Sequence, residues 1–174
     1  FSLSGDAKSH SLGGIATVNS MSLVNSYSLD ESHTKGKSLF TYGRLYTDVI
    51  DYFQFSYILS NYNKSTLGLS LVSKTIDKIS NTQEAWDDIG GAIFQEQINY
   101  DQITSYRDSQ ISLILFYSVY SSAGDISLKV KPIYTSLLTD RAYGLSLDLG
   151  FSKEYMKKIT HSFMINDALS FYKW

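Results

Sequence analysis

Apolar and polar residues alternate with a period of two in the stretch from residue 109 to 151, around which we expect the fold to be organised. The pattern predicts three long strands there, at residues 110–120, 125–138 and 142–151. In the last of them, one face carries Leu145, Leu147, Leu149 and Phe151, and the other carries Ser146, Asp148 and Gly150. Such alternation is typical of strands whose two faces meet different surroundings.

The strand before it repeats the pattern. Its apolar face carries Ile126, Leu128, Val130 and Tyr134, and its polar face carries Ser127, Lys129, Lys131 and Thr135. The polar segments between the three strands, residues 121–124 and 139–141, are too short for a parallel crossover. The sequence therefore predicts antiparallel hairpins.

Weaker alternation on both sides of this stretch predicts further strands. Upstream, they are expected at residues 38–46, 50–59 and 66–76, and downstream at residues 157–165. Residues 166–168 are interpreted as a turn, after which residues 169–174 begin another strand or end the chain.

Residues 77–106 interrupt the rhythm and predict a long polar loop, in which residues 93–100 form a short strand or hairpin extension. An acidic cluster lies on this loop, formed by Glu84, Asp87 and Asp88. Adjacent carboxylates on a polar loop are usually solvated, and a loop Ca²⁺ site is the alternative, although no EF-hand spacing is present.

Long strands, tight turns and two-sided alternation predict an all-β antiparallel fold, either a closed outer-membrane barrel or a soluble sandwich. Several strands reach the ~9–11 residues that a tilted strand needs to cross hydrocarbon, against ~5–6 in globular sheets. Strand length thus favours the barrel. With 174 residues, the chain is long enough for one domain with a sizeable core or for a barrel of about eight strands.

The composition narrows the classes of partner. The formal net charge is −2 and charged residues make up 18% of the chain, so no basic field would recruit nucleic acid. The chain has 14 Tyr, 9 Phe and 2 Trp. Tyr and Trp rings suit interfaces where one end of the ring meets an apolar environment and the other meets water, as in the aromatic girdles of membrane proteins. A Tyr-rich soluble β protein is the alternative. Without cysteine there is no disulfide framework.

We divide the chain into an N-terminal segment, residues 1–36, and the strand-rich residues 37–174. In the first, a Gly-rich turn at Gly13 and Gly14 leads into an extended segment, and residues 19–31 are compatible with a short helix. The chain begins with Phe1, from which we expect a processed or truncated N-terminus. No apolar run approaches the ~18 residues of a transmembrane helix.

The candidate binding residues are Lys129, Lys131 and Asp148, which alternation places on one face of neighbouring strands. In a barrel they line the lumen, and in a sandwich they form the solvent face. The three histidines, His10, His33 and His161, lack metal-ligand spacing. No phosphate-binding glycine motif or nucleophile elbow is present either, so we expect a protein that is not an enzyme and has no cofactor or metal.

Several segments, in order along the chain, resemble the PorV/PorQ family of outer-membrane proteins, relatives of the FadL-type fatty-acid transporters. Residues 7–16 (AKSHSLGGIA) resemble the family's A-R-S-x-G-x-G-G-A stretch, and residues 66–71 (TLGLSL) its T-L-G-F-S-V strand. Residues 143–150 (YGLSLDLG) give the best match, to G-x-G-x-D-L-G. Asn25 and Leu29 match its Y-N-P-A-G-L segment, which here lacks the Pro and Gly, and residues 166–168 followed by Trp174 resemble its strand-ending segment.

The resemblance implies a FadL-like barrel of fourteen strands, with an N-terminal segment folded toward the lumen, of which this chain is the N-terminal portion. The aromatic end, residues 171–174 (FYKW), resembles a barrel assembly signal and makes a complete eight-stranded barrel the alternative. The resemblance also implies the outer membrane of a Gram-negative bacterium and a role in type IX secretion. The partners would be outer-membrane lipid and secreted cargo proteins or other secretion components.

Two other functions stay open. The FadL relationship allows passage of a hydrophobic small molecule. A soluble β-sandwich acting as an adhesion or carbohydrate-binding module would instead bury Leu145, Leu147, Leu149 and Phe151 against a second sheet. A barrel would instead point these four residues at lipid, so their surroundings distinguish the two folds.

Overall fold

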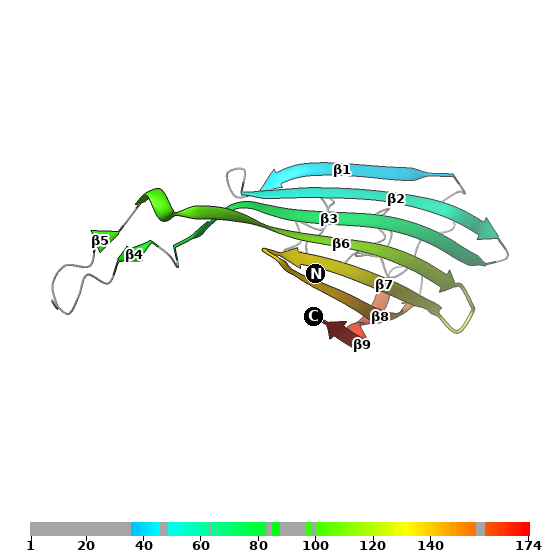
Figure 1. The fold of residues 1–174 in the computed structure, drawn as a ribbon. Helices are drawn as coiled ribbons and strands as arrows, with labels where there is room; N and C mark the ends of the chain where they lie inside the picture. The colour runs from blue at the N-terminus through cyan, green and yellow to red at the C-terminus, as the bar shows by residue number, and fades with distance from the viewer. Residues whose placement is uncertain are drawn as a thin grey trace.

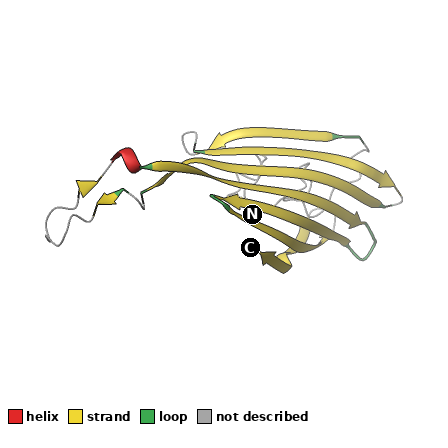
Figure 2. Ribbon diagram, in the orientation of Figure 1, coloured by secondary structure: helices red, strands yellow, loops and turns green. Residues whose placement is uncertain are grey.

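The computed structural model describes residues 36–45, 49–62, 64–82, 85–87, 97–98, 100–155 and 159–174. The chain is all-β in these residues, apart from one short 3₁₀ turn, η1 (Tyr100–Gln102) (Figures 1 and 2). Its strands are β1 (Ser38–Leu45), β2 (Ile50–Tyr62), β3 (Ser65–Asn81), β4 (Trp86–Asp87), β5 (Gln97–Ile98), β6 (Thr104–Val119), β7 (Asp125–Leu137), β8 (Asp140–Tyr155) and β9 (Ile159–Lys173). The seven strands predicted between residues 38 and 165 are confirmed, and most are longer than the alternation indicated.

Seven of the strands form one curved sheet in the order β1-β2-β3-β6-β7-β8-β9 (Figure 1). Every neighbouring pair is antiparallel, as the short turns predicted. Within the described part of the chain, β1 and β9 are the two edges and do not pair with each other, so this sheet is not closed into a barrel. The strands β4 and β5 form a separate two-stranded ladder.

The hairpin turns explain how such long strands are joined. Leu137 pairs with Asp140, so the loop between β7 and β8 has two residues, one of which, Leu138, has a φ of 54°. The sequence had placed this turn slightly later, at residues 139–141. Lys64, with a φ of 61°, lies in the turn between β2 and β3, where Ser65 Oγ donates to the Tyr62 carbonyl at 2.8 Å.

Gly124 closes the turn between β6 and β7 with a φ of 139°, which side-chain-bearing residues rarely adopt. A Cβ at this position would lie 2.6 Å from the Phe151 ring and 2.9 Å from the Ser152 carbonyl oxygen. We therefore expect Gly124→Ala to lower the free energy of unfolding by about 1–3 kcal/mol, as measured in a urea titration. An unchanged urea midpoint would show that this turn relaxes freely.

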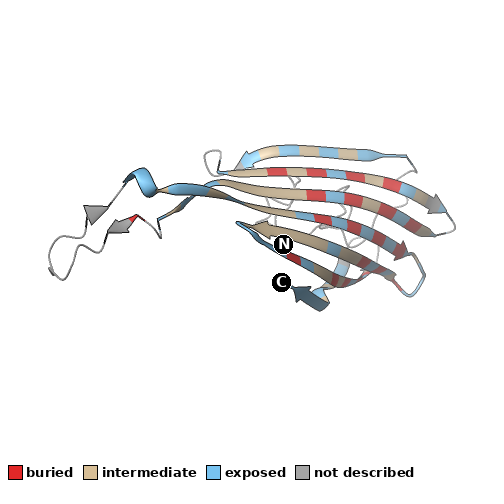
Figure 3. Ribbon diagram, viewed as in Figure 1, coloured by how far each residue is buried: buried red, intermediate tan, exposed pale blue. Residues whose placement is uncertain are grey.

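The two faces of the sheet differ in character. The inner face, defined here as the one with buried side chains, is mainly polar, and its buried polar members are Gln54, Ser56, Thr66, Ser70, Ser112, Ser118, Ser127, Lys129, Ser146, Asp148 and Ser152. It also buries six less polar residues, Tyr52, Ile58, Val72, Ile114, Phe116 and Ala142. The outer face is apolar and solvent-accessible, with Leu115 and Leu149 at 40% and 46% exposure. Figure 3 shows the resulting alternation of buried and exposed positions along the strands.

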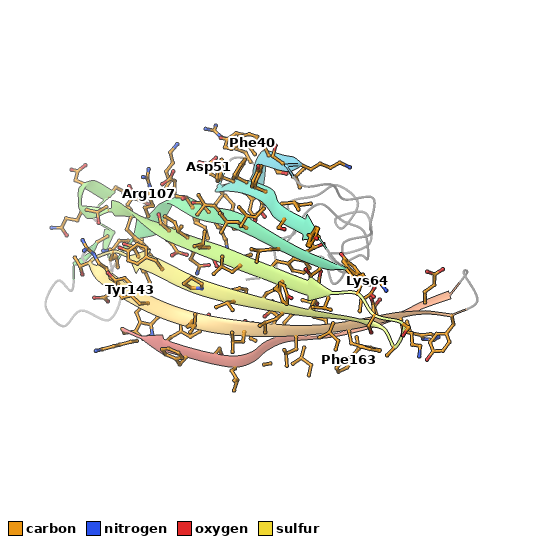
Figure 4. All side chains as sticks on the ribbon, turned by 90° about the vertical axis from the view of Figure 1, so that its right-hand side faces the viewer. Phe40, Asp51, Lys64, Arg107, Tyr143 and Phe163 are labelled. Carbon is orange, nitrogen blue, oxygen red and sulfur yellow. The ribbon has the colours of Figure 1, made fainter. Side chains whose placement is uncertain are left out.

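The strand register arranges the outer residues in rows that cross the sheet. The central row contains Tyr57, Leu69, Leu115, Val130, Leu147 and Leu169. The next row contains Leu67, Tyr117, Leu128, Leu149 and Ile165, and the last contains Val119, Ile126, Phe151 and Phe163. On the opposite side of the centre, one row includes Tyr42, Phe53, Ile111, Tyr134 and Tyr143. Figure 4 shows Tyr143 and Phe163 toward opposite ends of the sheet.

The predicted loop at residues 77–106 is only partly a loop. Strands β3 and β6 extend into it as a two-stranded arm that projects beyond the sheet (Figure 1). At its base two residues of β3, Asp77 and Lys78, oppose Arg107 alone, and Lys78 has a φ of 58°. Arg107 forms an exposed ion pair with Asp77 across this bulge. The break in alternation thus marks a bulge.

The turn predicted at residues 166–168 is wrong. The strand β9 continues through residues 166–168. All three of them lie opposite the single residue Asp148 of β8, between the pairs Leu147–Leu169 and Leu149–Ile165. They form a bulge inside one long edge strand, so residues 169–174 do not begin a new strand.

The expectations for residues 1–35, the Gly-rich turn, the short helix and the placement toward a lumen, lie outside the described residues. In the part of the chain that the structure describes, no helix is long and apolar enough to span a membrane.

Candidate functional site

A chain of hydrogen bonds joins the polar inner residues of β2 and β3. Tyr52 donates its hydroxyl to Gln54 Oε1 at 2.9 Å, and Gln54 Nε2 donates to Ser56 Oγ at 2.9 Å. Ser56 Oγ lies 2.8 Å from Ser70 Oγ, which also contacts the Phe55 carbonyl at 3.1 Å. Because buried polar groups are costly unless they are paired, this network makes a polar inner face compatible with a stable fold.

The charged part of the inner face is an ion-pair cluster formed by Lys131, Asp148 and Asp167. Lys131 Nζ lies 2.6 Å from Asp148 Oδ1 and 2.9 Å from Asp167 Oδ1. The side chains of Lys131 and Asp148 are only 12% and 3% exposed, whereas that of Asp167 is 45% exposed. One lysine therefore bridges a buried and a half-exposed carboxylate.

The same cluster holds the bulge of β9 in place. The Asp167 backbone N–H donates to Asp148 Oδ1 at 2.9 Å, and Ser146 Oγ donates to the Asp167 carboxylate. Asp167 has a φ of 53°, in the left-handed region that Asp tolerates better than most residues. The Asp148 carboxylate thus satisfies a backbone donor that the bulge removes from the regular ladder.

Lys129 is 1% exposed and directly opposite Asp148 in the register of β7 and β8. Together with Lys131, Asp148 and Asp167 it places four ionisable side chains close to one another. A buried charge needs a partner of opposite sign. The ion pairs of Lys131 with Asp148 and Asp167 meet this need.

The structure brings together the three candidate binding residues that the sequence singled out, Lys129, Lys131 and Asp148, which share the inner face of β7 and β8. Sequence reasoning missed Asp167, because it was assigned to a turn. The available signal was Asp167 itself, a charged residue in the short irregular stretch 166–168 between two stretches of alternating residues. The contacts do not by themselves indicate catalysis, since each group is engaged by another member of the cluster.

The other candidates are placed only in part. Glu84 and Asp88 lie outside the described residues. Asp87 of β4 pairs through its backbone with Gln97 of β5, and its side chain is not described. His161 of β9 stacks edge-on against Tyr155 at 5.4 Å between ring centroids, and His10 and His33 lie outside the described residues. Within those residues, no group of three His, Cys, Asp or Glu side chains is arranged to hold a metal ion.

Comparisons of the chain with protein-family models, with curated proteins and with solved structures find no match in any of the three. The family resemblance therefore depends on the sequence motifs alone, and the function is argued below from the two faces of the sheet.

Proposed function

We propose that this chain forms the wall of an outer-membrane β-barrel in a Gram-negative bacterium. One observation carries the proposal: apolar side chains are exposed on the outer face, while most of the buried side chains on the inner face are polar or charged. A water-soluble sheet buries its apolar face instead. Outward apolar and inward polar residues in strict alternation are the pattern of strands in a lipid bilayer.

The dimensions of the apolar band support the proposal. From Ile111 to Val119 five outward residues of β6 are apolar or aromatic. The band covers nine residues, Ile111 to Val119, which is within the ~9–11 residues that a tilted strand needs to cross hydrocarbon. Aromatic residues gather at its two ends, with Tyr134 and Tyr143 5.2 Å apart between ring centroids at one end and Phe151 beside Phe163 at the other. Such rings suit the bilayer interfaces.

The direction of the edge strands restricts how a barrel could be completed. In an antiparallel sheet of seven strands, the first and last run the same way, so β1 and β9 cannot pair antiparallel with each other. Antiparallel closure needs an odd number of additional strands. One more strand would give the eight-stranded alternative, and seven more would give the fourteen strands that the FadL-like resemblance implies. Hydrocarbon tolerates no open edge, so we propose that such strands are present in the working protein.

For the role of the barrel we propose a part in type IX secretion, by contact with cargo or other secretion components. The motif resemblance suggests it, and the arm of β3 and β6 offers a polar surface beyond the apolar band, with Lys78, Ser80 and Thr104 exposed. A second candidate, passage of a small molecule, is favoured by the polar inner face and by the pocket described in the next subsection.

The first experiment measures whether the protein, refolded with detergent micelles or lipid vesicles, migrates differently before and after boiling. We expect a β-rich, vesicle-associated species whose band shifts on heating. A β-rich monomer that is stable in plain buffer and ignores vesicles would refute the membrane assignment. Aggregation in both conditions would indicate that this chain alone does not provide all strands of the barrel.

A further inference from the structure

A pocket of about 360 Å³ lies on the inner face, next to the C-terminal end of β9. Its volume is within the ~300–1,000 Å³ range of small-molecule sites. Among the described residues its lining is formed by Gln110, Ile133, Thr135, Ala142, Tyr172 and Trp174. None of these residues belongs to the ion-pair cluster.

The register explains why a hollow forms here. Gln110, Thr135 and Ala142 form one row across β6, β7 and β8. The neighbouring row contains Ile133, Gly144 and Tyr172. Strand β8 contributes only small residues, Ala142 and Gly144, to these two rows, so the sheet is shallow there between larger neighbours.

Tyr172 forms an aromatic wall of the pocket. A Cβ on Gly144 would lie 2.4 Å from Tyr172 Cδ1, so the ring occupies the space that a side chain at position 144 would need. Trp174 follows two residues later and lines the same pocket. Gly144 thus lets the Tyr172 ring lie against the backbone of β8, while the residue stays 53% exposed and accessible to a ligand.

The chemistry of the lining selects a class of ligand. No charged side chain is among the described lining residues, which argues against an ionic ligand. The side chains of Gln110 and Thr135 have no hydrogen-bond partner in the described part of the chain, so an entirely apolar ligand would bury them unpaired at a cost. Two aromatic rings offer flat apolar surfaces beside this amide and hydroxyl.

We propose that the pocket binds a neutral sugar ring, stacked on Tyr172 and Trp174 and hydrogen-bonded to Gln110 and Thr135. A pyranose combines an apolar C–H face with uncharged hydroxyl groups, which matches both halves of the lining. The inference deepens the proposed function and rests on it, because it takes the inner face as a water-accessible lumen and names the class of solute found there.

Trp174 makes the site measurable. The chain has 2 Trp, and Trp86→Phe leaves Trp174 as the only indole reporter. The refolded, vesicle-inserted variant is titrated with glucose, galactose, N-acetylglucosamine and maltose while its fluorescence is recorded. Glucuronate and p-xylene serve as charged and apolar comparisons. We expect a saturable change with at least one neutral sugar and none with the two comparison compounds.

Variants in the same background test the assigned contacts. Gln110→Leu and Thr135→Val should each weaken sugar binding about tenfold, and Ala142→Phe should abolish it by filling the hollow. Tyr143→Phe, on the outer face of the same strand, is the matched control and should leave binding unchanged. The heat-induced band shift is recorded for each variant, so a folding defect is recognised.

The outcomes separate the two proposals. An inserted protein that ignores all four sugars, or that responds only to glucuronate or p-xylene, overturns the sugar site and leaves the barrel proposal intact. Sugar binding that survives Ala142→Phe also overturns it. If a folded protein binds sugar in plain buffer and does not enter vesicles, the sugar site is supported and the membrane proposal is refuted.

Discussion

Lysine at Leu115 is expected to block insertion of this chain into a bilayer, whereas lysine at Val119 is expected to be tolerated. Both residues lie on the outer face of β6, and their exposures are nearly equal at 40% and 38%. Leu115 is in the central apolar row and Val119 in the last one. A lysine at the bilayer midplane costs about 2–4 kcal/mol, falling to about 0–1 kcal/mol near the interfaces.

The measurement is the fraction of each variant that floats with lipid vesicles and resists added protease. Leu115→Met is the control for the loss of leucine itself. A soluble protein would tolerate both lysines alike, because charged substitutions at exposed positions usually change stability by less than about 0.5 kcal/mol. Equal behaviour of the two lysine variants would therefore contradict a lipid-facing outer surface.

The positions of the strands could be predicted because each one depends on a local pattern. In β8 the alternation from Ala142 to Phe151 needs no knowledge of the neighbouring strands. The ends were harder to predict. The last residues of β8, such as Lys153 and Glu154, are polar and lack alternation, and they are strand only because β9 pairs with them.

The alternation alone could not decide which face lies inside, because strands of a barrel and strands of a sandwich alternate with the same period of two. The sequence left Lys129 and Asp148 equally compatible with a lumen and with a solvent face. In the structure both side chains are buried, and the Leu149 side chain on the opposite face is 46% exposed. In the described residues, no second sheet covers that apolar face, as a sandwich would require.

Asp167 could not be recognised for a related reason. Asn and Asp favour turns through their local hydrogen bonds, so residues 166–168 resemble a turn when they are considered alone. What keeps them within β9 is tertiary: Asp148 accepts the Asp167 N–H and Lys131 bridges both carboxylates. The partners lie 19 and 36 residues away in sequence, beyond the reach of any local pattern.

Asp148→Leu is expected to be the most destabilising of the substitutions considered for this chain. The carboxylate is 3% exposed, it pairs with Lys131 at 2.6 Å and it caps the bulge at Asp167. Removing one partner of a buried ion pair typically costs about 3–5 kcal/mol, because the remaining charge stays buried without compensation. The readout is the free energy of unfolding in urea, with the protein in micelles or vesicles.

Two further variants separate the burial of charge from the loss of a contact. Lys131→Met combined with Asp148→Leu removes both charges and should recover much of the lost stability, since apolar replacement of a buried pair is often neutral. Asp167→Gly keeps the left-handed backbone and removes the half-exposed carboxylate, so it should cost no more than about 1 kcal/mol.

If Asp148→Leu costs as little as Asp167→Gly, or if the double variant is no more stable than Asp148→Leu alone, the cluster is not a buried ion pair in the working protein. A large cost for Asp148→Leu that the double variant relieves would instead establish that the inner face of β7 and β8 is built around compensated charge, and that the bulge of β9 depends on it.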